Sequence, residues 1–203
     1  MKNPVVLLAN GQEPSHSIPL KHLDNAGTIV CVDGGYEIAK KLNIQPTIVI
    51  GDFDSTNLKD VDNSVRSIKD EDQDKSDLEK AIELCISEKI SDITVIGSTG
   101  MRDDHNLANT LLIIRYLNQI EITIATNYYL INAFCGQKIF HSSIGTQISL
   151  ISIEENNFLT TSGLEFDLDN EKLKSSTNGI SNTTVKEEFA ISSNRPLIIF
   201  RKI

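Results

Sequence analysis

The sequence predicts an α/β fold in two parts, a parallel-sheet α/β domain followed by a small antiparallel β-sandwich domain. Up to about residue 125, short apolar runs rich in Ile and Val alternate with segments of helical periodicity, as in a parallel sheet covered by helices. From residue 128 on, only short alternating segments remain, and clusters of Gly, Asn and Ser separate them. We therefore expect the first domain at residues 1–130 and the second at residues 131–203.

The first domain is predicted to be Rossmann-like, with helices on both faces of its sheet. Its strands are read from continuous apolar runs, because strands of a parallel sheet are buried on both faces. Its helices are read from apolar residues that recur every three or four positions, such as Leu107, Leu111, Leu112 and Ile114. The region 57–72 is polar and ambiguous. Strands are expected at 4–9, 28–32, 47–50, 92–96 and 121–125, and helices at 18–25, 36–42, 76–89 and 104–117.

The second domain is predicted to contain strands alone. Six segments alternate between apolar and polar residues, and turn-forming residues separate them. They lie at 128–133, 138–142, 147–153, 164–168, 186–191 and 197–202.

Composition and charge limit the partners and the compartment. The net charge is −9, and no cluster of Lys and Arg is present, which argues against binding to nucleic acid or to an anionic membrane. No apolar run approaches the ~18 residues of a membrane span. The three cysteines, Cys31, Cys85 and Cys135, are far apart and lie in apolar segments, so we expect core residues in a reducing compartment. We expect a cytoplasmic protein.

Acidic residues gather where predicted strands end. Asp52 and Asp54 follow a buried strand and Gly51, a pattern that alone favours an ordinary turn. Other acidic groups occur at Asp33, at 72–77 and at 103–104, and the carboxyl ends of parallel strands share one edge of the sheet. Two carboxylates ~5 Å apart repel by roughly 3 kcal/mol at an effective dielectric constant near 20. Because Mg²⁺ prefers carboxylates with phosphate oxygens, we predict a Mg²⁺–nucleotide site here.

Two further segments carry polar groups beside this predicted site. Ser76 and Glu79 match a helix capping box, and a helix N-terminus is also a natural anion site, so both readings stay open. Lys80 lies one turn beyond Ser76 and could reach a phosphate. In the segment 100–109, Arg102 is suited to bidentate phosphate binding, whereas His105 alone would more often be structural.

Together these segments resemble the thiamin pyrophosphokinase family over nearly the whole chain. Each motif alone is weak, but all of them occur in the family's order. They are Asn10-Gly11, Asp33-Gly34-Gly35, Gly51-Asp52-Phe53-Asp54-Ser55, residues 72–81, residues 97–109, and Gly179-Ile180-Ser181-Asn182 near the end of the chain.

The resemblance implies an enzyme that transfers the pyrophosphoryl group of ATP to thiamin, giving thiamin diphosphate and AMP. It implies an α/β domain that binds ATP, a β-sandwich domain that binds thiamin, and a homodimer with thiamin between the subunits. Mg²⁺ ligands are expected at Asp52, Asp54 and Asp77, with Asp33 and Lys80 also catalytic. Substrate contacts are expected at Gly34, Gln73, Asp74, Ser76, Arg102, Asp104, His105 and Asn109, and for thiamin at Ser181 and Asn182.

Two other functions compete with this one. A phosphatase of the haloacid dehalogenase type uses an Asp-x-Asp-x-Thr motif, which residues 52–56 fit, although that motif usually follows the first strand and here two strands precede it. A sensor that binds thiamin or a nucleotide without catalysis would share the fold. This chain keeps the acidic, Arg and His positions expected for catalysis, which argues against a sensor.

Overall fold

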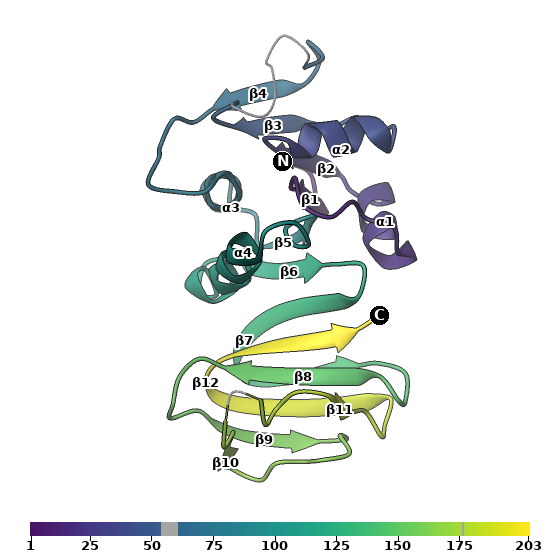
Figure 1. Ribbon diagram of the computed structural model, residues 1–203, viewed down its shortest axis with the longest axis vertical. Helices are drawn as coiled ribbons and strands as arrows, with labels where there is room; N and C mark the ends of the chain where they lie inside the picture. Colours follow the sequence, from purple (N-terminus) through teal and green to yellow (C-terminus); the bar gives the residue numbers. More distant parts are fainter. Residues whose placement is uncertain (54–60, 176) are drawn as a thin grey trace. The chain divides into compact units, whose positions relative to one another are not determined.

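The computed structural model describes residues 1–53, 61–175 and 177–203. The chain divides into two compact units, residues 1–127 and 128–203, which are coloured from purple to teal and from green to yellow in Figure 1. The predicted fold class is confirmed, because the first unit is built on a parallel sheet and the second contains only antiparallel pairs. Within the described residues, no helix is both long and apolar enough to span a membrane.

The first unit holds a parallel sheet in which strands that follow each other in sequence are not always neighbours. Its strand order is β6-β5-β1-β2-β3-β4, and every neighbouring pair is parallel. The chain thus moves outward from β1 in one direction through β4, and then returns to β5 on the other side of β1. The strands are β1 (Val5–Leu8), β2 (Thr28–Val32), β3 (Ile48–Gly51), β4 (Arg66–Lys69), β5 (Asp92–Ile96) and β6 (Glu121–Ala125).

The helices of the first unit lie on both faces of this sheet, as the sequence predicts. Connections between parallel strands are right-handed, so the reversal of direction at β1 sends the later helices to the opposite face. Figure 1 shows α1 and α2 on one side of the sheet and α3 and α4 on the other. The helices are α1 (Ser17–Asp24), α2 (Gly35–Lys41), α3 (Asp77–Ser87) and α4 (Asp103–Arg115).

The predicted apolar face of α4 is partly wrong. Leu112 and Ile113 are buried, but Leu107 is 64% exposed and Leu111 is also exposed. The C-terminal half of α4 packs toward the sheet, whereas its first two turns line a polar cavity with His105 and neighbouring amides. The inward positions of those turns are therefore polar, and the apolar residues predicted for the buried face lie partly on the exposed face.

The second unit is built around two long antiparallel strands, β7 (Tyr129–His141) and β12 (Glu188–Lys202). β12 pairs with β7 from end to end, with a register shift between Ser193 and Leu197. On either side of this shift it also pairs with β9 (Phe158–Ser162) and β8 (Gln147–Ser152). Two-residue strands β10 (Glu171–Lys172) and β11 (Asn182–Thr183) complete the unit. Its core includes Phe134, Phe140, Ile148, Leu159, Phe189 and Leu197.

Four expectations for the second unit are corrected. Each long strand was predicted as two short ones, and β9 was missed. The predicted strand at 164–168 is a turn region, joined to the sheet only by a bridge between Leu164 and Thr184 among the described residues. Cys135 is exposed rather than buried, because it follows buried Phe134 on β7 and points to the opposite face, next to an irregularity at Gly136 (φ 90°).

Candidate active site

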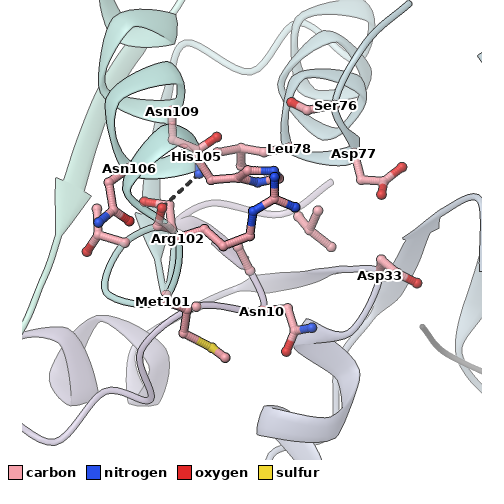
Figure 2. A pocket seen from close by; sticks show the side chains of 16 residues that line it. Asn10, Asp33, Ser76, Asp77, Leu78, Met101, Arg102, His105, Asn106 and Asn109 are labelled. Carbon is pink, nitrogen blue, oxygen red and sulfur yellow. Dashed lines mark hydrogen bonds between the residues drawn. The ribbon is translucent and has the colours of Figure 1, made fainter. Parts of the chain in front are cut away.

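A cavity of about 370 Å³ lies at the carboxyl ends of β1 and β5. These strands are the two between which the chain reverses direction, and open α/β sheets bind ligands at such switch points. The N-terminal turns of α3 and α4 complete the wall, as Figure 2 shows. The lining residues follow β1 (9–11), β2 (32–33) and β5 (97–99), or belong to the helix ends at 76–78, 101–102, 105–106 and 109.

Three carboxylates converge beside this cavity, and two of them, Asp33 and Asp77, line it. Oxygen atoms of Asp33, Asp52 and Asp77 all lie within 4.8 Å of one another. Asp33 is buried at the end of β2, and its Oδ1 atom has no hydrogen-bond partner within the described part of the chain. Asp54, the fourth expected member, lies outside the described residues. The three described aspartates therefore meet as the sequence predicts for a cation site.

Close backbone packing brings two of these aspartates together. Gly51 ends β3 beside β2, and a Cβ atom built there would lie 2.9 Å from the Cβ of Asp33. Any larger residue would force Asp33 or the strand beside it to shift. Gly51 itself is not left-handed; in this turn the left-handed conformation falls on Phe53, with φ 64°.

The surroundings of Asp77 disfavour its negative charge. Burial raises the pKa of its carboxyl, Lys80 opposes this rise, and the nearby charges of Asp52 and Asp33 add to it. Three carboxylate oxygens, one of them buried and unpartnered, are a donor set that Mg²⁺ accepts. The described residues thus fit a divalent cation.

Lys80 is placed differently from the sequence-based expectation of a phosphate contact. Its side chain is only 2% exposed. Its ammonium lies 3.0 Å from Asp77 Oδ1 and donates to the backbone carbonyl of Asp70 at 2.9 Å. Lys80 therefore holds Asp77 and the loop that precedes α3, rather than lining the cavity.

The start of α3 satisfies half of the predicted capping box. The Ser76 hydroxyl accepts a hydrogen bond from the Glu79 backbone N–H at 3.3 Å, which makes Ser76 the N-cap. The reciprocal contact of a capping box, from the Glu79 side chain to the Ser76 backbone N–H, does not form between these two described residues. The Glu79 side chain is buried and instead accepts a hydrogen bond from the Tyr116 hydroxyl. Ser76 also lines the cavity, so capping and ligand contact are compatible at this residue.

The start of α4 brings a cation and several amides to the cavity. Arg102 donates to both oxygens of Asp104 at 3.2 and 2.6 Å, and this exposed pair lowers the pKa of Asp104 to about 2. The Asn109 side chain donates to the carbonyl of Ser98 at 2.7 Å, and Asn106 accepts from the Gly100 N–H at 2.9 Å. These amides fix the loop after β5 against the helix.

The cavity gathers some of the predicted site residues and leaves others apart. Asp33, Ser76, Asp77, Arg102, His105 and Asn109 line it. Gly34, the N-cap of α2, and Asp52 are not among the lining residues, and Gln73, Asp74 and Asp104 are exposed and also outside the lining. Four lining residues with polar side chains were not predicted as contacts: Asn10, Ser98, Thr99 and Asn106.

The second unit contains a cavity of another kind, of about 350 Å³. Ser181 and Asn182, the expected thiamin contacts, line it together with mostly apolar side chains. Asn182 is fixed by a pair of hydrogen bonds with the backbone of Phe166, at 3.1 and 2.8 Å. The apolar lining residues are Leu150, Phe166, Leu168, Leu173 and Ile180.

Fold and site together define an α/β protein with an acidic ligand cavity at a switch point, followed by an all-β unit. The family model for "Thiamin pyrophosphokinase, catalytic domain" matches residues 20–124, more than half of the chain, and the model for "Thiamin pyrophosphokinase, vitamin B1 binding domain" matches residues 137–198. The chain therefore belongs to the thiamin pyrophosphokinase family.

Individual relatives agree with this assignment. A curated protein of Caenorhabditis elegans, named thiamin pyrophosphokinase 1, is 29% identical over 124 residues, which are 56% of this chain. The match covers only 51% of that relative, about half of its length. Solved thiamin pyrophosphokinases of Bacillus subtilis and Candida albicans share the fold, with TM-scores of 0.85 and 0.86 at 24% and 16% identity. These matches cover 98% of this chain and 98% and 88% of the two structures.

Proposed function

We propose that this protein is an enzyme that transfers the pyrophosphoryl group of ATP to the hydroxyl of thiamin, giving thiamin diphosphate and AMP. The observation that carries this proposal is the meeting of Asp33, Asp52 and Asp77 at a cavity walled by two helix N-termini. Helix N-termini favour phosphate groups, and clustered carboxylates favour a cation that offsets the phosphate charge. Both features occur in the segment that the catalytic-domain model matches.

In the proposed reaction, the thiamin hydroxyl oxygen attacks the β-phosphorus of ATP. The bond from that phosphorus to the α–β bridging oxygen breaks, AMP leaves, and the hydroxyl proton passes to a base among the clustered aspartates. Asp52, Asp54 and Asp77 would hold Mg²⁺, which neutralises phosphate charge when bound. Arg102 and His105 would contact the phosphates, with Ser76, Gln73 and Asp74 near the nucleotide. Catalysis would come mainly from positioning and charge stabilisation.

Product analysis tests this proposal directly. The protein is incubated with thiamin, ATP and Mg²⁺, and the products are separated and identified. We expect AMP and thiamin diphosphate in equal amounts, and neither product when a chelator removes the metal. Formation of ADP with thiamin monophosphate would mean transfer of a single phosphoryl group and would contradict the proposal.

The two competing functions have less support. Asp52 follows β3, the third strand along the chain, rather than the first strand as in haloacid dehalogenase phosphatases. An aspartyl-phosphate captured on Asp52 by mass spectrometry would revive the phosphatase. Tight binding of thiamin with no AMP release from Mg-ATP would indicate the sensor.

We also propose a cytoplasmic homodimer with thiamin bound between its subunits. The support is the family resemblance together with an open, mostly apolar cavity around Ser181 and Asn182. Light scattering at micromolar concentration should give twice the mass of one chain. A fully active monomer would contradict the dimer without affecting the proposed reaction.

A further inference from the structure

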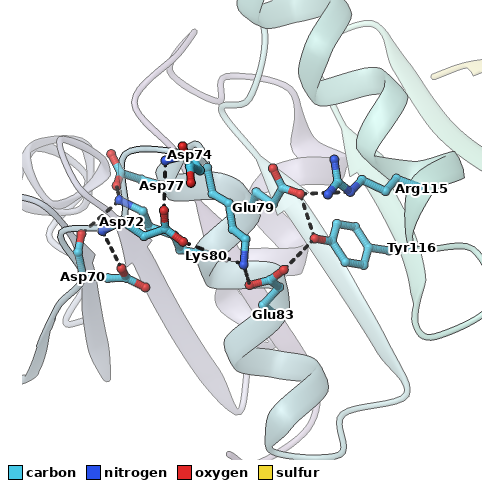
Figure 3. A network of polar contacts seen from close by, with 10 residues as sticks. Asp70, Asp72, Asp74, Asp77, Glu79, Lys80, Glu83, Arg115 and Tyr116 are labelled. Carbon is cyan, nitrogen blue, oxygen red and sulfur yellow. Dashed lines mark hydrogen bonds and ion pairs between the residues drawn. The ribbon is translucent and has the colours of Figure 1, made fainter.

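Tyr116, the C-cap of α4, lies in a polar network that the proposed reaction does not use (Figure 3). Its hydroxyl lies 2.8 Å from Glu79 Oε1 and 2.9 Å from Glu83 Oε1. Tyr116 is only 5% exposed, and Glu79 is also buried. A buried carboxylate needs hydrogen-bond donors, so this hydroxyl is part of what keeps Glu79 in place.

Two glutamates and two basic side chains surround the Tyr116 hydroxyl. Glu79 and Glu83 lie one turn apart on α3, where like charges repel. Arg115 contacts Glu79 at 3.1 Å, and Lys75 contacts Glu83 at 2.8 Å. Burial and the two carboxylates raise the pKa of Tyr116, so the phenol stays protonated and remains a donor. The hydroxyl is therefore the point that both glutamates share.

The network reaches the cavity through the start of α3. Glu79 belongs to the same first turn as Asp77, one of the three converging carboxylates. Lys75 belongs to the loop that carries Gln73 and Asp74. At the opposite end of its helix, α4 supplies His105 to the cavity wall. Tyr116 thus ties together the two helices whose N-terminal turns form that wall.

We propose that Tyr116 is a positioning residue for the metal site: by holding Glu79, its hydroxyl fixes the first turn of α3 and thereby the direction in which Asp77 points. Tyr116 touches neither the cavity nor the three aspartates. This inference rests on the proposed function of the carboxylate cluster, and it extends that function to a residue one helix away.

The test compares two tyrosines of equal burial. Tyr36 is also 5% exposed and lies in the same unit, but its hydroxyl accepts from the backbone N–H of Asp62 at 3.1 Å. Tyr116→Phe and Tyr36→Phe remove the same atom. We expect Tyr116→Phe to weaken Mn²⁺ binding at least fivefold, measured by electron paramagnetic resonance without nucleotide. Tyr36→Phe should stay within twofold of the unmutated protein.

Steady-state kinetics give a second readout. Tyr116→Phe should require at least fivefold more metal for half-maximal turnover, while kcat at saturating metal falls less than threefold. A loss of stability alone would not raise the metal requirement. Tyr36→Phe should therefore lower the melting temperature and leave the metal requirement unchanged. Equal Mn²⁺ affinity for the two variants would overturn the inference.

Two further outcomes are decisive. If Tyr116→Phe does not fold, Arg115→Gln replaces it, because Arg115 holds the same glutamate from an exposed position. We expect Mn²⁺ binding to weaken two- to threefold, and an unchanged affinity would overturn the inference. Absence of Mn²⁺ binding in the unmutated protein would contradict the proposed metal site itself. The two failures are therefore distinguishable.

Discussion

The acidic cavity of the first unit and the apolar cavity of the second unit differ in the chemistry of their walls. The cavity in the first unit is lined by aspartates, an arginine, a histidine, hydroxyls and amides. The described lining of the cavity in the second unit has no charged side chain and consists of leucines, Phe166, Ile180 and a few small polar groups. The contrast supports the proposal that phosphates and metal bind in the first unit and the organic part of thiamin in the second.

The contrast follows from the two kinds of sheet. A parallel sheet collects strand ends and helix N-termini at one edge, so it supplies free N–H groups and places for carboxylates. The antiparallel strands of the second unit pair along their length, and what they offer a ligand is mainly side-chain surface. Each unit thus presents the chemistry that its topology makes available.

The largest expected effect concerns the charge of Asp77. Asp77→Asn keeps the size of the side chain and leaves the Ser76 cap intact. If Asp77 ligates Mg²⁺, turnover should fall at least ~100-fold, about 2.7 kcal/mol of transition-state stabilisation. A role confined to the helix dipole would cost only roughly 0.3–1 kcal/mol of stability and leave turnover nearly intact.

A matched control separates this effect from a general loss of charge. Asp92→Asn makes the same change at an exposed position at the start of β5, the opposite end of a strand from the site. Its turnover at saturating Mg²⁺ should equal that of the unmutated protein. Turnover of Asp77→Asn within a few fold of this control would remove Asp77 from the site.

A smaller effect is expected from the apolar cavity. Ile180→Ser removes a half-exposed apolar side chain from its wall and should cost about 1 kcal/mol of ligand contact, or about fivefold in KM for thiamin. KM for ATP should not change. Ile153→Ser, at 52% exposure against 46% for Ile180, removes a comparable side chain that lies outside this cavity. A parallel rise in both KM values, or an equal effect of the control, would contradict the assignment of thiamin to this unit.

The smallest expected effect is on stability against pH, in metal-free protein. The pKa of Asp77 is raised above 3.8, so the folded state takes up a proton before the unfolded state does, and the Asp77 contribution to stability increases as pH falls through this raised pKa. The pKa of Asp104 is lowered to about 2, so its contribution is lost as pH falls from 3.8 through about 2.

Melting temperatures should show these opposite signs. Asp77→Asn should melt higher than the unmutated protein at neutral pH, and the difference should shrink toward pH 3.8. Asp104→Asn should melt slightly lower, and that difference should shrink only below pH 3.8, since an exposed ion pair contributes little. A lower melting temperature of Asp77→Asn at neutral pH would mean that Asp77 lacks the repulsive surroundings described above.

Much of the first unit could be predicted from the sequence. β2, β5 and β6 have the expected bounds, because a short apolar run between turn residues is a strong signal for a buried parallel strand. The second unit was harder, since β12 continues through the irregularity between Ser193 and Leu197, where Asn194 and Pro196 suggest a break. β9 was missed because only Leu159 and Thr161 of its five residues are buried.

The chemistry of the candidate site could be predicted from the sequence, but the contacts between its residues could not. Aspartates after strands could be read directly, but Asn10 and Ser98 line one cavity only because β1 lies beside β5, and strand order is a tertiary property. For the same reason the sequence suggested a capping box at Ser76 and Glu79, whereas Glu79 pairs with Tyr116, 37 residues away. The local sequence pattern therefore predicts which residues carry the chemistry, whereas tertiary packing determines which residues they contact.

The unequal surroundings of the three cysteines give this chain a natural attachment point for a probe. Burial raises the pKa of the Cys31 and Cys85 thiols to about 12, so at neutral pH they stay protonated as well as sheltered. Cys135 is exposed on β7. A maleimide dye added to the folded protein should therefore label one thiol of three, and its fluorescence would report on the second unit without any change to the sequence.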